Sequence, residues 1–376
     1  MVNFIICEFD PFHNGHEYLM KKASGAPTVC IMSGHITQRG TFAMTDKWTR
    51  AEAALLCGAD LVLELPAAAA CGSAIDFARG AIAAANATGL AGRLCFGTEG
   101  DVLQDLKSLA ALSKDAVQKK VKTEIKNGAS SAAAMMAAYR TLAPKKSEIL
   151  KSPNNLLAFE YIKANEKFDL YALPRTGVSH DAETPVGKYA SASYLRQHID
   201  EIHAFVPADV LPLYKKMSKE GRILDADRAE LIITAALRRT TKEEWEAACP
   251  GGLGARLFTA FENETTLSSA IDAVKSKCFT HSEIRRAVLR TYCGLRPLTD
   301  PLPYLRVLGL NKTGAALLRR MRPTAPLLVK PAGVCLLPPE ARDIFTTDMQ
   351  ITDAFGFFLH TPQPKGWEYR SPVVIK

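Results

Sequence analysis

The first hundred residues alternate short apolar runs with amphipathic stretches, and this alternation constrains the fold more than any other feature of the chain. The apolar runs are rich in β-branched residues and end near glycine or proline; they cover residues 2–8, 28–33, 60–66 and 92–100. The stretches between them have helical periodicity; they cover residues 15–23, 45–59 and 73–87. Buried strands separated by helices predict an α/β fold, a Rossmann-like parallel sheet with helices on both faces.

Unusual polar residues follow the predicted strands. The segments are EFDPFHNGH, SGHITQRGT, ELP and FGTEG. Ligands of parallel sheets bind beyond the carboxyl ends of the strands. The sequence therefore predicts a binding site at that edge of the sheet, independently of any family resemblance.

The pattern changes after residue 196. One more strand is expected at 169–175, and ASASYLRQHI opens a helix. Helical periodicity then dominates, apart from a short α/β piece between residues 304 and 330. We therefore expect an α/β domain over residues 1–196 and a mostly helical domain over residues 197–376.

Charge and cysteine content narrow the class of protein. The 47 Lys and Arg exceed the 39 Asp and Glu, for a net charge of +8, which suits phosphate substrates or a polyanionic partner. The nine cysteines show no CxxC spacing, so we expect reduced thiols in a cytoplasmic protein rather than a zinc motif. No secretory signal and no long uncharged apolar run is evident, so no membrane association is predicted. The sequence does not indicate whether the protein is a monomer or an oligomer.

His13 and His16 lie at the expected start of the first helix, in HNGH. A helix N-terminus offers unpaired N–H groups and partial positive charge, and Gly15 lets a ligand approach the backbone. Two imidazoles there can bind phosphate oxygens. A surface turn is the simpler interpretation of the pair alone. A zinc site is disfavoured, because the pair lacks the HExxH form and a third ligand; no metal site is predicted.

Context favours the phosphate interpretation. HNGH after a first strand resembles the HxGH signature of the adenylyltransferase superfamily, and SASYLR resembles that superfamily's second nucleotide motif. Ser191 or Ser193 can cap the helix, and Arg196 can reach a phosphate, although a plain N-cap with a solvated arginine is the alternative.

The resemblance narrows to the tRNA(Met) cytidine acetate ligase family. It rests on CEFDPFHNGHEYL, SGHITQRGTFAMTDKWTRAEAALLCGADLVLELP, FGTE, SPNNLLAFEY, LPRTG and RVLGLNKTGAALL. The resemblance implies an ATP-dependent ligase that activates acetate as acetyl-adenylate. The same resemblance implies that this ligase then transfers the acetyl group to N4 of the wobble cytidine of elongator tRNA(Met). Mg²⁺ is expected with the ATP.

The resemblance also implies the site. His13, His16 and Arg196 are the expected catalytic residues. The expected ATP-binding residues are Cys7, Glu8, Phe9, Asp10, Pro11, Phe12, His13, Asn14, Gly15, His16, Glu17, Tyr18, Leu19, Met20, Gly97, Asn154, Arg175, Thr176, Ser191 and Ser193. A helix N-cap is the alternative role for Asn154, and a surface salt bridge for Arg175. Gln38, Arg39 and Lys47 are candidates to face acetate or the acceptor.

Three segments depart from the family pattern. Phe9 and Asp10 replace its tyrosine and asparagine, SGHI replaces SGNF, and Thr176 replaces an isoleucine. These changes bear on substrate identity more than on ATP binding.

Basic clusters in the second half are candidate tRNA contacts, with a solvated helix face as the alternative for each. They are Arg238 and Arg239; Lys275 and Lys277; Arg285, Arg286 and Arg290; and Arg319, Arg320 and Arg322. Tyr292 and Phe279 are expected in the core. Two other functions stay open: a nucleotidyltransferase or acyl-adenylate ligase with a small-molecule acceptor, and a non-catalytic RNA-binding protein with a retained nucleotide fold.

Overall fold

The fold is built on one mostly parallel sheet in the order β5-β4-β1-β2-β3-β6-β7, with β8 paired to β6. The computed structural model describes residues 1–175, 183–276, 278–298 and 302–376. The strands are β1 (Val2–Cys7), β2 (Thr28–Ser33), β3 (Leu61–Leu65), β4 (Gly92–Thr98), β5 (Asp169–Pro174), β6 (Leu305–Leu310), β7 (Leu327–Leu328) and β8 (Val374–Ile375). The predicted α/β class is confirmed.

Helices pack on both faces of the sheet, because successive strand residues point to opposite faces. Phe4 and Val29 lie in a cluster with α4 (Ala74–Ala87) and α9 (Pro153–Ala164). Their neighbours Ile5 and Cys30 lie in another cluster with α1 (Asn14–Lys22), α2 (Lys47–Leu56) and α11 (Leu211–Lys219). The strands are therefore buried on both sides, as their unbroken apolar runs predict.

The strand order reverses beside β1. The chain goes from β1 to β2 and β3 on one side, then crosses to β4 and β5 on the other. Such a switch point leaves a crevice at the carboxyl ends of the two diverging strands. The segment Glu8–His13 leaves β1 at this point, and Thr98 ends β4 beside it.

Caps fix the helices near the site. The Asp46 carboxylate accepts from the N–H of Thr49 at 2.8 Å, which starts α2 where it was expected. Ser73 and Asp76 form a capping box at the start of α4. The short helix α3 (Ala67–Ala70) was not predicted, because four alanines carry no periodicity.

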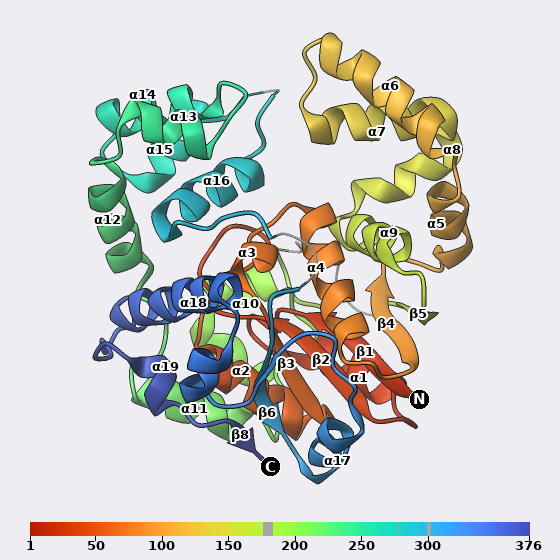
Figure 1. Ribbon diagram of the computed structural model, residues 1–376, viewed down its shortest axis with the longest axis vertical. Helices are drawn as coiled ribbons and strands as arrows, with labels where there is room; N and C mark the ends of the chain where they lie inside the picture. Colours follow the sequence, from red (N-terminus) through yellow and green to blue (C-terminus); the bar gives the residue numbers. More distant parts are fainter. Residues whose placement is uncertain (176–182, 277, 299–301) are drawn as a thin grey trace.

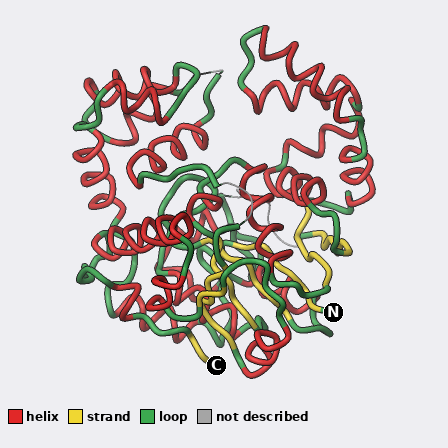
Figure 2. Tube along the Cα trace, in the orientation of Figure 1, coloured by secondary structure: helices red, strands yellow, loops and turns green. Residues whose placement is uncertain are grey.

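Two groups of helices lie away from the sheet, on opposite sides of the view in Figure 1. Figure 2 shows that both groups consist of helices and loops. One group follows β4: α5 (Leu103–Ala110), α6 (Lys114–Lys126), α7 (Ser131–Leu142), α8 (Pro144–Ser147) and the 3-10 turn Glu148–Lys151. The other comprises α12 (Ala226–Leu237), α13 (Lys242–Ala248), α14 (Leu253–Asn263), α15 (Leu267–Val274) and α16 (His281–Cys293).

Residues after 300 return to the sheet. β6 pairs with β3, and this pairing is antiparallel. The remaining helices are α10 (Ala192–Gln197), α17 (Lys312–Arg320), α18 (Pro339–Phe357), α19 (Trp367–Arg370) and the 3-10 turns Ile199–Ala204 and Pro331–Leu336. The division near residue 196 stays a prediction, and strands from beyond it extend the sheet.

Two further findings concern the described residues. None of their helices combines the length and the apolarity that crossing a membrane requires. All nine cysteines are free thiols, in keeping with their scattered spacing.

Candidate active site

A cavity of about 220 Å³ opens at the switch point beyond the carboxyl ends of β1 and β4. Its lining comes from segments far apart in the chain, including Glu8, His16, Gly97, Asn154 and Arg196. The cavity therefore lies where the sequence predicted a binding site, and it joins HNGH to SASYLR.

His13 and His16 hold the start of α1. The Nδ1 atom of His13 accepts from the N–H of Gly15 at 3.0 Å, and the Nδ1 atom of His16 accepts from the N–H of His13 at 3.3 Å. Their rings stack with centroids 3.8 Å apart. Because each Nδ1 accepts, the proton of each neutral imidazole lies on Nε2. His16 lines the cavity, so its Nε2–H is suited to donate to an anion there.

Aromatic rings fix the orientation of His16. The ring of Phe9 meets the His16 ring edge to face at 5.0 Å, and Phe12 lies 5.6 Å from it. Phe9 has φ of 51°, a left-handed conformation that is rare for a bulky residue. The N–H of Phe12 donates to the Tyr214 hydroxyl at 2.7 Å, which ties this loop to α11.

Arg196 joins the second motif to the first. Its Nη1 donates to the carbonyl of Asp10 at 2.7 Å and lies 3.5 Å from the Asp10 carboxylate. Its Nη2 donates to the hydroxyl of Ser193 at 3.1 Å, and Arg39 donates to the same hydroxyl at 3.4 Å. Ser191 caps α10, accepting from the N–H of Tyr194 at 3.0 Å. The serine that caps the helix and the serine that meets the arginines are therefore different residues.

The carboxylate of Glu8 lines the cavity just after β1. Its Oε1 accepts from the N–H of Gln38 at 2.7 Å, and its carbonyl accepts from the guanidinium of Arg50 at 2.6 Å. Arg50 is wholly buried and also donates to the carbonyls of Ser33 and Gly34. Burial raises the pKa of Glu8, and the nearby Asp10 carboxylate adds to the rise. The sequence does not predict that Glu8 binds the backbone of Gln38 or that Arg50 holds three loop carbonyls, because these contacts join segments far apart in the chain.

Glu99 contacts two residues that line the cavity on the side of β4, Asn154 and Arg175. Its Oε1 accepts from the side chain of Asn154 at 2.8 Å and lies 3.4 Å from Nε of Arg175. A Cβ on Gly97 would lie 3.4 Å from the Arg175 side chain, an ordinary van der Waals contact, so the arginine alone does not require a glycine here. Ser152, not Asn154, is the N-cap of α9, so the N-cap alternative for Asn154 is wrong. Within FGTE the sequence predicts a role in ATP binding for Gly97 alone, and the role of Glu99 emerges only from its contacts with Asn154 and Arg175.

The predicted ATP-site residues divide into two sets. Those that line the cavity are Cys7, Glu8, Phe9, Asp10, Gly15, His16, Tyr18, Leu19, Gly97, Asn154 and Arg175, together with Arg196. Those outside its lining are Pro11, Phe12, His13, Asn14, Glu17, Met20, Ser191 and Ser193. Phe12 and Met20 belong to the core beside α2, and Glu17 pairs with Lys21 at 2.7 Å. Thr176 lies outside the described residues.

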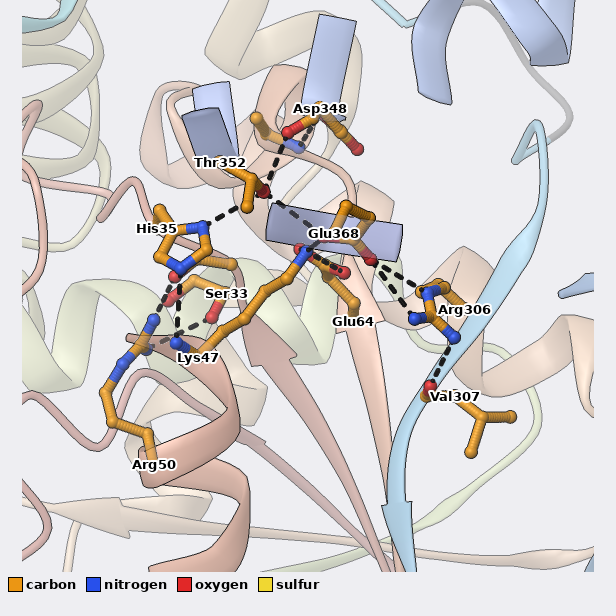
Figure 3. Close-up of polar contacts among 12 residues, drawn as sticks. Ser33, His35, Lys47, Arg50, Glu64, Arg306, Val307, Asp348, Thr352 and Glu368 are labelled. Atoms are coloured by element: carbon orange, nitrogen blue, oxygen red, sulfur yellow. Dashed lines mark hydrogen bonds and ion pairs between the residues drawn. The ribbon is translucent and has the colours of Figure 1, made fainter. Parts of the chain in front are cut away.

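Lys47 is not available to a substrate. It is 1% exposed, and its ammonium lies 2.8 Å from the carboxylates of both Glu64 and Glu368 (Figure 3). Burial alone would lower its pKa, but Glu368 and Glu64 raise it above the ordinary value. The expectation that Lys47 faces acetate or the acceptor is therefore wrong, whereas Gln38 and Arg39 do line the cavity.

His35, one of the departures from the family pattern, belongs to the same buried network. Its Nε2 accepts from the N–H of Lys47 at 3.3 Å (Figure 3). Its ring stacks on that of Phe355, with centroids 4.3 Å apart. Burial holds its pKa well below the ordinary value, so it stays neutral. This departure therefore changes packing behind the loop rather than the cavity wall.

The basic clusters are not all near the cavity. On α16, Arg286 donates to the carbonyl of Gln38 at 3.3 Å, and Arg290 donates to carbonyls of Ala68 and Cys71. Arg286 thus holds α16 against the cavity loop after β2, and Arg290 holds it against α3, while Arg285 is exposed. The cluster of Arg319, Arg320 and Arg322 lies on and after α17, at the far end of the molecule from α16 (Figure 1).

Other candidates in the helical part are placed as follows. Arg238, Arg239 and Lys275 are exposed, and Lys277 lies outside the described residues. Tyr292 and Phe279 pack against the core of this part, as expected. Across the part of the chain that the structure describes, no three His, Cys, Asp or Glu side chains are grouped to hold a metal ion.

The family follows from comparison with known sequences. The model of the HIGH nucleotidyl transferase family matches residues 2–367. The tRNA(Met) cytidine acetate ligase of Clostridium novyi is 30% identical over 401 residues, covering 99% of both chains. The chain belongs to the tRNA(Met) cytidine acetate ligase family. The enzyme of that name from Acetivibrio thermocellus is 31% identical, again covering 99% of both chains.

Solved structures of the family have the same fold. TmcAL of Thermotoga maritima in its apo form matches with a TM-score of 0.93 at 24% identity, covering 100% of this chain and 99% of that one. The same protein bound with alpha-thio ATP matches with a TM-score of 0.90. These structures bear on the fold; the family resemblance drawn from the motifs is confirmed by the family model and the two sequence relatives.

Proposed function

We propose that this chain is an ATP-dependent ligase that activates acetate as acetyl-adenylate and transfers the acetyl group to N4 of the wobble cytidine of elongator tRNA(Met). One observation carries the proposal: HNGH and SASYLR meet at one cavity at the sheet's switch point, where Arg196 contacts Asp10. The names of the family members supply the acyl group and the acceptor, and alpha-thio ATP bound to the Thermotoga protein supports ATP as the nucleotide.

The first step needs positioning and positive charge rather than an enzyme nucleophile. An acetate oxygen attacks the α-phosphorus of ATP, and pyrophosphate leaves. The Nε2–H of His16 and the guanidinium of Arg196 are the donors for the phosphate oxygens, and the partial positive charge at the start of α1 adds to the attraction. His13 serves this step indirectly, because it caps the helix and stacks on His16.

The opposite wall offers groups for the rest of the nucleotide. Gly97 lets the ligand approach the end of β4, and Asn154 and Arg175 are held side by side by Glu99. Arg39 lines the cavity beside Ser193 and is our candidate for binding acetate.

Mg²⁺ is expected to enter with ATP. It prefers oxygen ligands and commonly keeps water while binding substrate phosphates with one or two carboxylates. In this cavity both oxygens of Asp10 are engaged, by Met44 and Arg196. Asp10 therefore has no oxygen left for a resident ion, which suits an ion that enters with the triphosphate.

The acceptor is proposed to bind where α16 meets the cavity loops. Arg285 is exposed on this helix, next to residues that touch Gln38. Phosphate contacts by arginines and capture of unpaired bases are the usual means of holding a tRNA loop. A cytoplasmic location is consistent with such a substrate and stays a prediction.

Incubation of the protein with ATP, labelled acetate and purified tRNAs tests the proposal. We expect label in elongator tRNA(Met) alone, with one AMP and one pyrophosphate for each acetyl group. Acetate-dependent pyrophosphate release without labelled tRNA would instead indicate a small-molecule acceptor. No ATP turnover, with tRNA binding intact, would indicate a non-catalytic RNA-binding protein.

A further inference from the structure

Transfer of the acetyl group releases a proton, and the cavity must offer a base for it. The exocyclic amine attacks the acyl carbon of the adenylate, a C–N bond forms, and the bond from carbon to the phosphate oxygen breaks. AMP leaves with that electron pair, and the nitrogen gives up one proton. This requirement rests on the proposed function, and it can be compared with the titratable groups that line the cavity.

Most of those groups are unsuited to accept the proton. The Nδ1 of His16 already accepts from the His13 backbone, so its Nε2 carries hydrogen. The oxygens of Asp10 accept from the N–H of Met44 at 2.7 Å and pair with Arg196. Burial raises the pKa of the Cys7 thiol and the Tyr161 hydroxyl, so both keep their protons near neutral pH.

Glu8 differs from these groups in geometry. Its Oε1 accepts from the N–H of Gln38, and among the described residues no hydrogen bond or ion pair is made by its Oε2. The residue lines the cavity directly after β1, between the cavity-lining residues Cys7 and Phe9. Arg50 fixes its backbone through the 2.6 Å hydrogen bond to its carbonyl. One carboxylate oxygen is thus anchored, and the other is left for a ligand.

We propose that Glu8 is the general base of acetyl transfer, with Oε2 taking the proton from the acceptor amine and passing it to water. Gln38 holds the carboxylate in place, and Arg39, on the same loop, faces the same cavity. A base should have a pKa nearer the working pH than that of a free carboxylate, and burial of Glu8 shifts its pKa in that direction.

The surroundings of Glu8 define its expected pH behaviour. The charged groups facing it are Asp10, Arg50 and Arg196, together with Arg39 across the cavity. Asp10 opposes ionisation of Glu8, while Arg50 and Arg196 favour it. Since a base works deprotonated, the transfer rate should rise as the pH increases through the Glu8 pKa and then level off.

The test separates the two half-reactions in Glu8→Gln, which keeps an oxygen for the Gln38 N–H. Acetate-dependent exchange of pyrophosphate into ATP reports adenylate formation, and single-turnover labelling of tRNA reports transfer, both measured from pH 5 to pH 9. We expect transfer to fall about 100-fold more than exchange does, and the pH dependence of transfer to be lost. Glu8→Asp should recover part of the transfer rate and its rise with pH.

Three outcomes would count against the inference. Equal losses of exchange and transfer would make Glu8 a structural or ATP-binding residue. Unchanged transfer would mean that another group or water takes the proton. Absence of acetate-dependent exchange in wild type would refute the proposed function itself. Glu52→Gln is the matched control, because that carboxylate lies on α2 outside the cavity lining and pairs with Lys376.

Discussion

The guanidinium of Arg196 donates a hydrogen bond of 2.7 Å to the carbonyl of Asp10, 186 residues earlier in the chain. Asp10 in turn accepts from the buried N–H of Met44 at 2.7 Å. Asp10 thus connects three segments: the loop after β1, the loop after β2 and α10. Its position is one at which this chain departs from the family pattern.

Substitution at Asp10 tests this connection. Asp10→Asn keeps an oxygen for the Met44 N–H and loses only the ion pair, so its free energy of unfolding should fall by less than about 1 kcal/mol. Asp10→Ala leaves the Met44 amide without its acceptor and should cost about 1–3 kcal/mol. Urea unfolding measures both. Equal destabilisation by the two variants would mean that the hydrogen bond to Met44 is unimportant.

Gly40 is predicted to be required for contact between the cavity loop and α16. It has φ of 75°, and a Cβ there would lie 2.5 Å from the backbone nitrogen of Arg286. Gly58 has φ of 104° with no atom within 4 Å of such a Cβ, so Gly58→Ala is a control for backbone strain alone. Gly58→Ala should cost about 1–2 kcal/mol, and Gly40→Ala at least about 1 kcal/mol more. Thermal unfolding compares them; equal shifts would contradict the close approach.

Glu99 should act on ATP binding through the residues that it holds. Glu99→Ala frees Asn154 and Arg175 from a shared anchor, so we expect the KM for ATP to rise about tenfold with kcat little changed. Glu148→Gln is a suitable control, because that exposed carboxylate pairs with Lys151 at the surface. Steady-state pyrophosphate release measures both. An unchanged KM for ATP would place Asn154 and Arg175 outside the nucleotide site.

Asp348 makes stability depend on pH. It accepts from the Tyr304 hydroxyl and from the N–H of Ala67, and burial raises its pKa to about 7 from an ordinary 3.8. The folded protein therefore keeps a proton that the unfolded chain has lost, so this contribution declines as the pH rises from about 4 to about 7. The loss should be on the order of 4 kcal/mol.

Asp348→Asn should remove that dependence, since an amide does not titrate. Urea unfolding at intervals from pH 5 to pH 8 provides the comparison with wild type. Asp343→Asn, exposed on the same helix, should leave the wild-type slope in place. If Asp348→Asn keeps the full slope, other buried groups such as Glu64 are responsible for it.

Local patterns predicted the features that local forces decide. The strands depend on residues close in sequence, and so do the caps Asp46 and Ser191, each of which was one of two candidates. The first helix was expected to start near Gly15 or His16, and it begins at Asn14 with His13 as its N-cap. The two nucleotide motifs could be placed at one edge of the sheet because parallel strands share their carboxyl edge.

Features that depend on distant partners were not predictable in this way. The sequence around Lys47 predicts an accessible cation, because no nearby residue indicates its ion pair with Glu368. The antiparallel pairing of β6 with β3 was likewise not expected. Glu99 and Arg50 gain their roles from contacts with other loops. The identity of the acyl group and of the acceptor rests on the family, since no spacing of residues specifies either.

His16 provides the most direct test of the account, which places adenylate formation at the cavity beyond β1. Acetate-dependent pyrophosphate exchange should be measured for wild type, His16→Ala and the exposed control His203→Ala, with tRNA binding measured in parallel. We predict that His16→Ala loses exchange by about 100-fold or more, binds tRNA as wild type does, and that His203→Ala changes neither. Exchange that persists in His16→Ala, or a loss of exchange matched by an equal loss of tRNA binding, would contradict the account.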